Sequence, residues 1–190
     1  MNPALIVIDV QKGIDNSLHW GGNRNNPEAE GNIKLLLAEW REKGYPVFIV
    51  QHMSVSSESP FHPSNPGNSL KDFIFVGKGE KLIHKSTANA FLNTALEEDL
   101  RRLEVKDVVI VGFVTNNSIE STARMCGELD FETIVVSDGT AAFDKQGVDG
   151  TIYPSELVHQ MSLSNLDEEY ARIRTTRQVL SMIKNKTLSL

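Results

Sequence analysis

Polar side chains that can carry chemistry follow the apolar runs of this sequence, each where a run ends. They are Asp9 and Gln11 after residues 4–8, Gln51 and His52 after residues 46–50, Lys85 after residues 81–83, and Thr115, Asn116, Asn117 and Ser118 after residues 108–113. If the runs are parallel strands, their carboxyl ends meet at one edge of a sheet, where ligands bind in open α/β folds. The pattern therefore predicts one site built from distant parts of the chain.

Asp9, Lys85 and Ser118 are the members of this set that suit acid–base or covalent chemistry. A carboxylate at the end of an apolar strand is a candidate general acid or base, although Asp9 could instead cap a loop. Lys85 could pair with Asp9, or be an ordinary surface lysine. Ser118 is expected at the start of a helix, where backbone amides favour developing negative charge but where serine is also a common cap.

The elements that must position these residues alternate along the chain. Continuous apolar runs at 4–8, 46–50, 108–113 and 133–136, with weaker ones at 81–83 and 171–174, are typical of strands buried on both faces. Helical patterns are expected at 26–43, where Asn26 is the predicted N-cap, and at 93–103, 117–129, 154–166 and 176–183. This alternation predicts an α/β fold, a three-layer, doubly wound, mostly parallel sheet with helices on both faces, as a single domain over residues 1–190. Residues 54–79, rich in Ser, Pro, Gly and Asn, are expected to form a long irregular loop.

The composition excludes several function classes. The chain has 190 residues, 25 acidic against 19 basic ones, and a formal net charge of −6, which argues against general nucleic-acid binding. No apolar run reaches the roughly 18 residues of a membrane span, and the N-terminal residues lack a signal-peptide pattern. One cysteine, Cys126, excludes a disulfide framework. We therefore expect a cytoplasmic protein that acts on a small molecule, without nucleic-acid or membrane partners.

Three motifs occur in a fixed order along the chain. Residues 4–11 read ALIVIDVQ, residues 84–91 read HKSTANAF, and residues 111–125 read VGFVTNNSIESTARM, followed by VVSDGTAAF at 135–143. Together they resemble the isochorismatase-like cysteine hydrolases, which include nicotinamidases, N-carbamoylsarcosine and ureidoacrylate amidohydrolases, and isochorismatases. The resemblance covers residue 5 to about residue 180. It implies hydrolysis of a non-peptide C–N bond in a small amide, carbamoyl or ureide substrate, without a cofactor.

The resemblance also implies a catalytic triad of Asp, Lys and Cys. The Asp takes the thiol proton, the Lys stabilises the thiolate, and the Cys attacks the carbonyl. Carried onto this sequence, the triad is Asp9, Lys85 and Ser118, so a serine stands at the nucleophile position. Either the serine is an engineered replacement that disables the enzyme, or it is natural and the chemistry differs. Isochorismatases lack the cysteine and hydrolyse a vinyl ether with the Asp as acid, and a non-catalytic binding protein is a third interpretation.

The surroundings of position 118 carry two further expectations. The resemblance implies a cis peptide bond between Phe113 and Val114, and an oxyanion hole formed by the amides of Val114 and Ser118. Cys126 is not expected to replace the missing nucleophile, because eight residues of helix separate it from Ser118 by about 12 Å. It shares a helical stripe with apolar residues, so burial is its predicted role.

The segments that follow the first and second predicted strands bear on metal and substrate binding. Nicotinamidases of this family hold a metal with an Asp-x-His motif, but residues 50–54 read VQHMS and lack the Asp, so we predict no metal site. Trp20, Arg24 and Asn25 could wall a pocket and bind a polar or carboxylate group, or Trp20 could pack on its neighbours. The other candidate substrate-binding residues are Gln11, His52, Phe91, Asn117, Ile119 and Tyr153, with core packing as the alternative for the apolar ones. Proteins of this family are commonly oligomers, which implies a homodimer or homotetramer.

Overall fold

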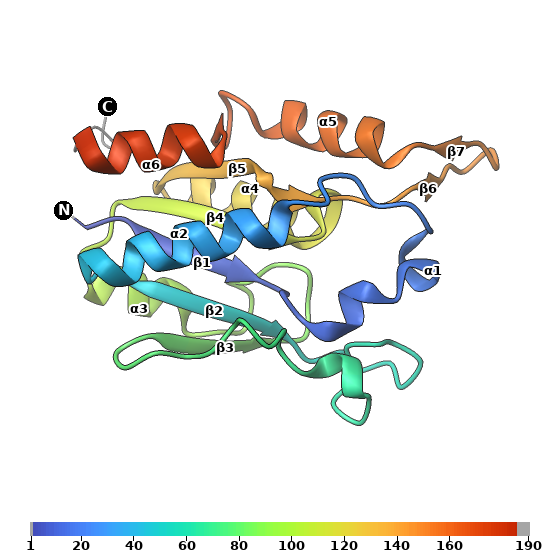
Figure 1. Ribbon diagram of the computed structural model, residues 1–190, viewed down its shortest axis with the longest axis horizontal. Helices are drawn as coiled ribbons and strands as arrows, with labels where there is room; N and C mark the ends of the chain where they lie inside the picture. The colour runs from blue at the N-terminus through green and yellow to red at the C-terminus, as the bar shows by residue number, and fades with distance from the viewer. Residues whose placement is uncertain (1, 186–190) are drawn as a thin grey trace.

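One six-stranded sheet forms the centre of the computed structural model, which describes residues 2–185 (Figure 1). The strand order is β3-β2-β1-β4-β5-β8, and every neighbouring pair is parallel. The strands are β1 (Ala4–Ile8), β2 (Val47–His52), β3 (Lys81–Lys85), β4 (Asp107–Phe113), β5 (Glu132–Ala141) and β8 (Arg172–Arg174). A separate antiparallel hairpin, β6 (Lys145–Gln146) with β7 (Ile152–Tyr153), projects beyond the sheet.

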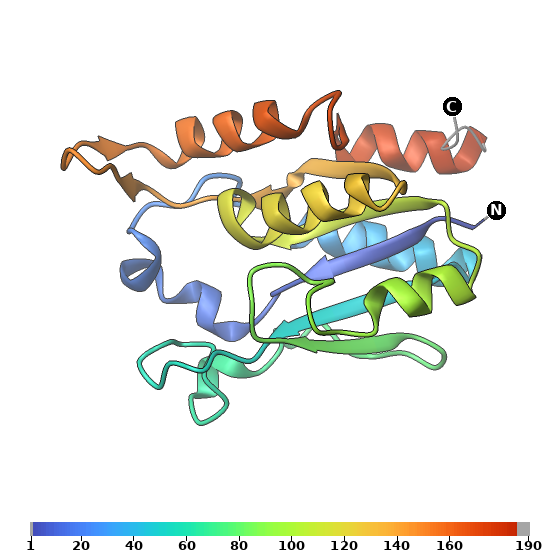
Figure 2. The same ribbon diagram turned by 180° about the vertical axis from the view of Figure 1, so that it is seen from behind.

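Helices cover both faces of this sheet. α2 (Ala29–Lys43) and α6 (Thr176–Asn185) lie on one face (Figure 1), and α3 (Leu96–Arg102) and α4 (Glu120–Glu128) lie on the other, with α5 (Ser155–Leu166) beside α4 (Figure 2). The apolar stripe of α2 is buried against the sheet as its spacing predicts. The architecture is therefore the three-layer, doubly wound α/β fold that the sequence predicts, and no helix of residues 2–185 is long and apolar enough to cross a membrane.

The strands form where continuous apolar runs allow burial on both faces. All residues of β1 and β4 are buried, and Ile8 at the end of β1 pairs with Val50 of β2 and Gly112 of β4. Fully burying one such aliphatic side chain stabilises the fold by about 1.5–3 kcal/mol. β1 and β4 are therefore a rigid base for the residues that follow them.

Two helix starts differ from the predicted ones. α2 begins at Ala29 instead of Asn26, because Asn26 adopts a left-handed φ of 46° and its side-chain amide donates to the carbonyls of Ser137 and Thr140 instead of capping the helix. α3 begins at Leu96 instead of Asn93, because Asn93 adopts a left-handed φ of 58° and belongs to the preceding loop.

The strand order places a topological switch point between β1 and β4. The chain runs from β1 outward to β2 and β3, and then returns to β4 on the opposite side of β1. The loops after β1 and β4 therefore leave the sheet toward opposite faces and open a crevice at the carboxyl ends of the strands. The short helix α1 (Ser17–Trp20) and the first part of the irregular stretch, residues 54–70, surround this end, on the right in Figure 1, whereas residues 75–79 lie near the start of β2.

Candidate active site

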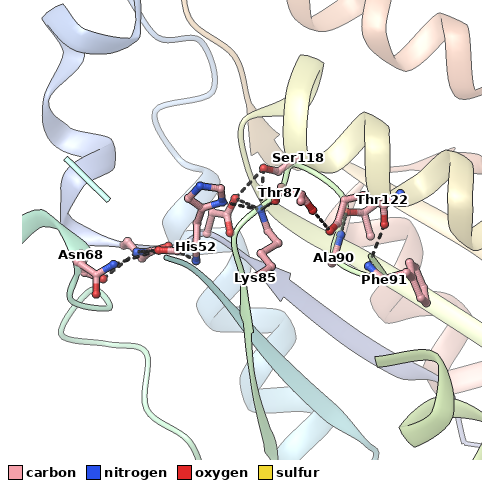
Figure 3. Close-up of polar contacts among 11 residues, drawn as sticks. His52, Asn68, Lys85, Thr87, Ala90, Phe91, Ser118 and Thr122 are labelled. Atoms are coloured by element: carbon pink, nitrogen blue, oxygen red, sulfur yellow. Dashed lines mark hydrogen bonds and ion pairs between the residues drawn. The ribbon is translucent and has the colours of Figure 1, made fainter. Parts of the chain in front are cut away.

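Asp9, Lys85 and Ser118 come together at this switch point. The Ser118 hydroxyl donates to Asp9 Oδ2 at 2.7 Å, and Lys85 Nζ donates to the same oxygen at 2.8 Å and to Ser118 Oγ at 3.1 Å (Figure 3). The side chains of Lys85 and Asp9 are only 0% and 3% exposed, and Ser118 is 5% exposed. Because all three side chains have little contact with solvent, the Asp9–Lys85 ion pair is weakly screened, and its field acts strongly on the serine oxygen.

Each of the three residues stands at a strand end. Asp9 follows β1 with a left-handed φ of 54°, and Lys85 is the last residue of β3. Ser118 lies in a π-helical turn, Thr115–Ile119, between β4 and α4. The Phe113–Val114 peptide bond that leads into this turn is cis, as the resemblance implies.

Gly112 permits the close approach of β4 to β1 at this point. Its φ is +123°, and a Cβ on it would stand 2.0 Å from the carbonyl oxygen of Ile8. A side chain here would push the two strands apart. The glycine therefore allows the turn that carries Ser118 to sit directly over Asp9.

The Lys85 ammonium group has four acceptors for its three hydrogens. Besides Asp9 and Ser118, it lies 3.0 Å from the Thr87 carbonyl and 3.1 Å from His52 Nδ1. An ammonium group only donates, so the contact with His52 Nδ1 is a hydrogen bond in the tautomer that carries the ring hydrogen on Nε2. Burial and the Lys85 charge lower the pKa of His52, which keeps this ring neutral at pH 7.

Gln11 is buried and does not line the cavity that is predicted to hold the substrate, and its side chain instead supports the loops around it. Its amide nitrogen donates to the carbonyls of His52 at 3.0 Å and Asn68 at 2.7 Å, and its amide oxygen accepts from the His52 backbone at 2.7 Å. Asn68 in turn donates to the Phe61 carbonyl at 2.6 Å. These bonds fasten residues 54–79 to the ends of β1 and β2.

A cavity of about 190 Å³ opens beside the three residues. It is lined by Asp9, His19, Trp20, His52, Ser59, Phe61, Ala88, Phe113, Val114, Asn117 and Ser118. Trp20 packs against Phe61 with ring centroids 5.0 Å apart, and its indole N–H is held by the Gly13 carbonyl at 2.9 Å. Of the predicted pocket residues, Trp20, His52 and Asn117 are thus placed on the wall of this cavity.

Arg24 and Asn25 do not reach the cavity, which corrects the prediction that they wall it. Both terminal nitrogens of the Arg24 guanidinium donate to Glu30, each at 2.9 Å, and the guanidinium carbon lies 5.3 Å from the centroid of the Phe113 ring. Asn25 is 8% exposed and bonds to the Ala142 amide and to Glu156. Their hydrogen bonds fix the loop instead of meeting a ligand.

The predicted wall residues Phe91, Ile119 and Tyr153 also lie elsewhere. Phe91 and Ile119 belong to the apolar core under α3 and α4, and the Phe91 ring points away from Lys85 (Figure 3). Tyr153 is on β7 and lines a separate depression with Leu157 of α5. Phe91 and Ile119 are away from the cavity because they are buried in the core, and Tyr153 is away from it because it lies on the projecting β6–β7 hairpin.

Five lining residues escaped the sequence analysis: His19, Ser59, Phe61, Ala88 and Phe113. Phe113 ends β4, so its place at the carboxyl edge was available as a signal. Ser59 and Phe61 come from the irregular residues 54–79, where no periodicity indicates which side chains turn inward.

Cys126 is buried in α4, as predicted, and is no alternative nucleophile. Its exposure is 0%, and burial raises the pKa of its thiol to about 12. A thiol with such a pKa supplies almost no thiolate at neutral pH. Among residues 2–185, no three His, Cys, Asp or Glu side chains converge as a metal site requires.

Asp9, Lys85 and Ser118 thus place a carboxylate, an ammonium group and a hydroxyl in mutual contact at the switch point of a doubly wound sheet, and such a set of groups can support acid–base or covalent chemistry. Residues 3–178 match the Isochorismatase domain family, and the chain belongs to this family of hydrolases. The isochorismatase family protein YrdC of Bacillus subtilis (strain 168) is 42% identical over 178 residues, which are 94% of each chain. Nicotinamidase 3 of Arabidopsis thaliana is 33% identical over 179 residues, 86% of this chain and 79% of its own. The crystal structure of an isochorismatase family protein from Chromobacterium violaceum ATCC 12472 superposes with a TM-score of 0.91 at 38% identity, covering 97% of this chain and 94% of that one.

Proposed function

We propose that this hydrolase cleaves a non-peptide C–N bond in a small amide, carbamoyl or ureide substrate, with Asp9, Lys85 and Ser118 as the reacting group. The observation that carries the proposal is the Ser118 hydroxyl, which donates to a buried carboxylate at 2.7 Å while a buried ammonium donates to its oxygen at 3.1 Å. Ser118 Oγ thus contacts a general base, Asp9, that can take its proton and a cation, Lys85, that can stabilise the resulting negative charge, and both effects activate a nucleophile. Relatives named nicotinamidase and ureidoacrylate amidohydrolase support the substrate class.

Bond formation starts from the hydrogen bond that already exists. Asp9 Oδ2 takes the Ser118 proton as Oγ attacks the carbonyl carbon of the substrate, and the Lys85 ammonium stabilises the charge on Oγ before the bond forms. The carbonyl oxygen becomes an oxyanion. Val114 and Ser118 both line the cavity, and we assign their backbone amides to this oxyanion.

Bond cleavage returns the proton. Asp9 gives it to the leaving nitrogen, the C–N bond breaks, and ammonia or an amine departs, leaving an ester on Ser118. Water then loses a proton to Asp9 and attacks the ester carbonyl. Asp9 returns that proton to Oγ, which restores the serine and releases the acid.

The serine is the slow component of this scheme. A hydroxyl is a far weaker acid than a thiol, and one carboxylate activates it poorly. A thiol beside Lys85 would ionise readily. We therefore expect the Ser118→Cys variant to be faster than the native chain.

The experiment is an ammonia-release assay across a panel of small amides, carbamoyl compounds and ureides. It compares the native chain with Ser118→Cys and with Ser118→Ala, which removes the nucleophile at nearly the same size. We expect kcat of Ser118→Cys to exceed that of the native chain by about tenfold or more, and Ser118→Ala to release no ammonia. The absence of turnover in all three chains, or equal rates in the native chain and Ser118→Ala, would contradict the proposal.

The same variants separate the other interpretations. Vinyl ether hydrolysis with Asp9 as acid requires activity that Asp9→Asn abolishes and Ser118→Cys does not improve. A binding protein without catalysis requires ligand binding without turnover in every variant.

A further inference from the structure

We infer that His159 of α5 is a positioning residue for the proposed reaction. Through the Thr115 side chain, it holds the π-helical turn Thr115–Ile119 in the register that presents Ser118 to Asp9. This inference rests on the proposed function and adds to it a residue from a distant part of the chain. A buried histidine thereby acquires a part in the reaction without contacting the substrate.

The turn between β4 and α4 does not have the hydrogen-bond register of an α-helix. The Ile119 amide donates to the Val114 carbonyl at 3.3 Å, and the Glu120 amide donates to the carbonyl of Thr115. Both bonds span five residues, one more than in an α-helix. An α-helical register would instead direct the Ser118 amide to the Val114 carbonyl and withdraw it from the oxyanion to which we assign it. Because π-helical turns are rare, contacts from outside the turn must favour this register.

α5 supplies such contacts at Thr115, the first residue of the turn. This helix packs against the turn and against α4 (Figure 2). Thr115 Oγ1 lies 2.8 Å from His159 Nδ1, and the Thr115 carbonyl accepts from the Ser162 hydroxyl at 3.2 Å. Thr115 is fully buried, and His159 and Ser162 are buried as well. One helix therefore holds both the hydroxyl and the carbonyl of Thr115.

His159 makes the firmer of these two contacts. The Ser162 hydroxyl has a single hydrogen, and Ser162 Oγ also lies 2.6 Å from Glu120 Oε2, so this hydrogen is shared between two acceptors. The Thr115 hydroxyl, in contrast, is directed at one ring nitrogen of His159. The substitutions that test the inference are therefore made at Thr115 and His159.

The state of the His159 ring suits this contact. Burial lowers the pKa of His159 by more than Glu156 and the Ser137 carbonyl raise it, so the ring is neutral at pH 7. In the tautomer that carries the ring hydrogen on Nε2, Nδ1 accepts from the Thr115 hydroxyl. The Asn26 side-chain nitrogen, which donates to the Ser137 carbonyl at 2.8 Å, lies 3.4 Å from Nε2 on the other side of the ring. The ring is thus held between Thr115 and Asn26.

Neither His159 nor Thr115 has a direct part in the chemistry. Neither residue lines the cavity beside Ser118. Thr115 and Ser118 are nevertheless the two sides of one turn, so a movement of Thr115 is passed to the serine. The Ser118 hydroxyl must stay at its 2.7 Å contact with Asp9 Oδ2, and a misplacement of about 1 Å in an active site can cost about a hundredfold in rate.

The first test measures turnover of the best substrate of the amide panel in the Ser118→Cys background. Thr115→Val removes the hydroxyl at nearly the same shape, and His159→Leu removes its acceptor. We expect each substitution to lower kcat by about tenfold or more and to change KM by less than about threefold. Because both remove the same hydrogen bond, the double variant should be about as slow as the slower single variant.

Conservative substitutions and a matched control separate positioning from a general loss of packing. Thr115→Ser keeps the hydroxyl and His159→Asn keeps an acceptor near Nδ1, so each should retain at least about a third of kcat. Thr133→Val removes an equally buried hydroxyl, which donates to the Phe131 carbonyl at 3.0 Å at the opposite end of the sheet, and should leave kcat unchanged. Circular dichroism at the assay temperature checks that each variant is folded.

The second test needs no substrate and follows the alkylation of Ser118→Cys by iodoacetamide. Thr115→Val and His159→Leu should each slow this alkylation by about fivefold or more, because the thiol would move away from the Lys85 ammonium group that stabilises its thiolate. Thr115→Ser and Thr133→Val should not slow it. Peptide mass spectrometry locates the label, and a loosened core would be visible as labelling of the buried Cys126.

The outcomes keep the two proposals apart. If Thr115→Val and His159→Leu match Thr133→Val in turnover and in alkylation, the inference is overturned and the proposed function stands. A raised KM with unchanged kcat, or labelling of Cys126 in the folded variants, also overturns the inference, because it indicates substrate binding or general packing. If Ser118→Cys releases no product from any substrate, the proposed function is contradicted, and the alkylation rates still decide the inference.

Discussion

Position 118 and its two partners share a single carboxylate oxygen. Ser118 and Lys85 both donate to Asp9 Oδ2, so a proton moving from the serine arrives at an oxygen that a cation already stabilises. Lys85 also contacts His52 and Thr87, so its position is held from four sides. Proton transfer from Ser118 therefore depends on the placement of one oxygen, Asp9 Oδ2, and of the Lys85 ammonium group beside it.

Thiol reactivity separates Cys126 from position 118. Burial raises the pKa of the Cys126 thiol to about 12, so the native chain should not react with iodoacetamide, a small uncharged alkylating reagent, until it unfolds. Ser118→Cys should gain one rapidly reacting thiol per chain, because its sulfur would lie beside Lys85 at the cavity. Reaction of the folded native chain, or an equally slow Ser118→Cys, would contradict this assignment.

The pKa of His52, which is lowered by burial and by the Lys85 charge, should make stability depend on pH. Because the pKa of folded His52 lies below 6.5, the unfolded chain binds more protons as the pH falls. The stabilisation is present above pH 6.5 and is lost as the pH falls from there through the pKa of folded His52. We expect the free energy of unfolding to fall less between pH 7 and pH 5 in His52→Gln than in the native chain, measured by urea denaturation. His159 is unchanged in both proteins and serves as the internal control, and an identical fall would contradict the prediction.

Side-chain partners explain why some site residues could be predicted and others not. Asp9, Lys85 and Ser118 could be placed at one edge of the sheet because each lies at or shortly after the end of an apolar run, and their assignment as a triad came from the family resemblance. Arg24 was misassigned because its occupation by Glu30 depends on how α2 packs against the preceding loop. A sequence shows which residues can bind an anion, but not which of them are already neutralised.

At the scale of elements, the spacing of apolar residues predicted which segments form strands and helices. It did not predict the residues at which the helices α2 and α3 begin. β1 and the stripe of α2 lie where the pattern predicts them. The start of α2 was wrong because Asn26 bonds to carbonyls near β5, more than a hundred residues away. Residues 54–79 form the predicted irregular stretch, but the place of Phe61 depends on the Asn68 side chain, which donates to the carbonyls of Phe61 and His52.

Glu30 joins α2 to two loops, and this junction should be sensitive to acid. Burial raises the pKa of Glu30, but hydrogen bonds from Arg24 and Lys71 outweigh this and lower the pKa to about 2. The stabilisation is present above pH 4.5, the pKa of the unfolded chain, and is lost as the pH falls toward 2. We expect Glu30→Gln to cost on the order of 2 kcal/mol of unfolding free energy at pH 6 and less at pH 3. Glu42→Gln, at an exposed position of α2, is the matched control, and an equal cost at both pH values would contradict the assignment.

At the scale of the whole molecule, one surface has the properties of a contact between copies of this chain. Tyr153, Leu157 and Met161 are 39%, 47% and 55% exposed, and they line one depression between β7 and α5. Exposed apolar groups that cluster in this way favour association. We expect a homodimer or homotetramer in solution.

Light scattering after gel filtration tests this expectation. The double variant Leu157→Glu and Met161→Glu should have a lower mass than the native chain, whereas Leu18→Glu, on α1 and 89% exposed, should keep the native mass. A monomeric native chain would contradict the expectation.

The central claim is that position 118 forms a covalent bond with the substrate, and one measurement tests it most directly. Ser118→Cys is mixed with the best substrate of the amide panel, quenched in acid within the first turnover, and examined by intact-protein and peptide mass spectrometry. We predict a mass increase equal to the acyl group, on the peptide that contains position 118 and not on a peptide that contains only Cys126. Turnover without any adduct, or an adduct at Cys126, would contradict the account.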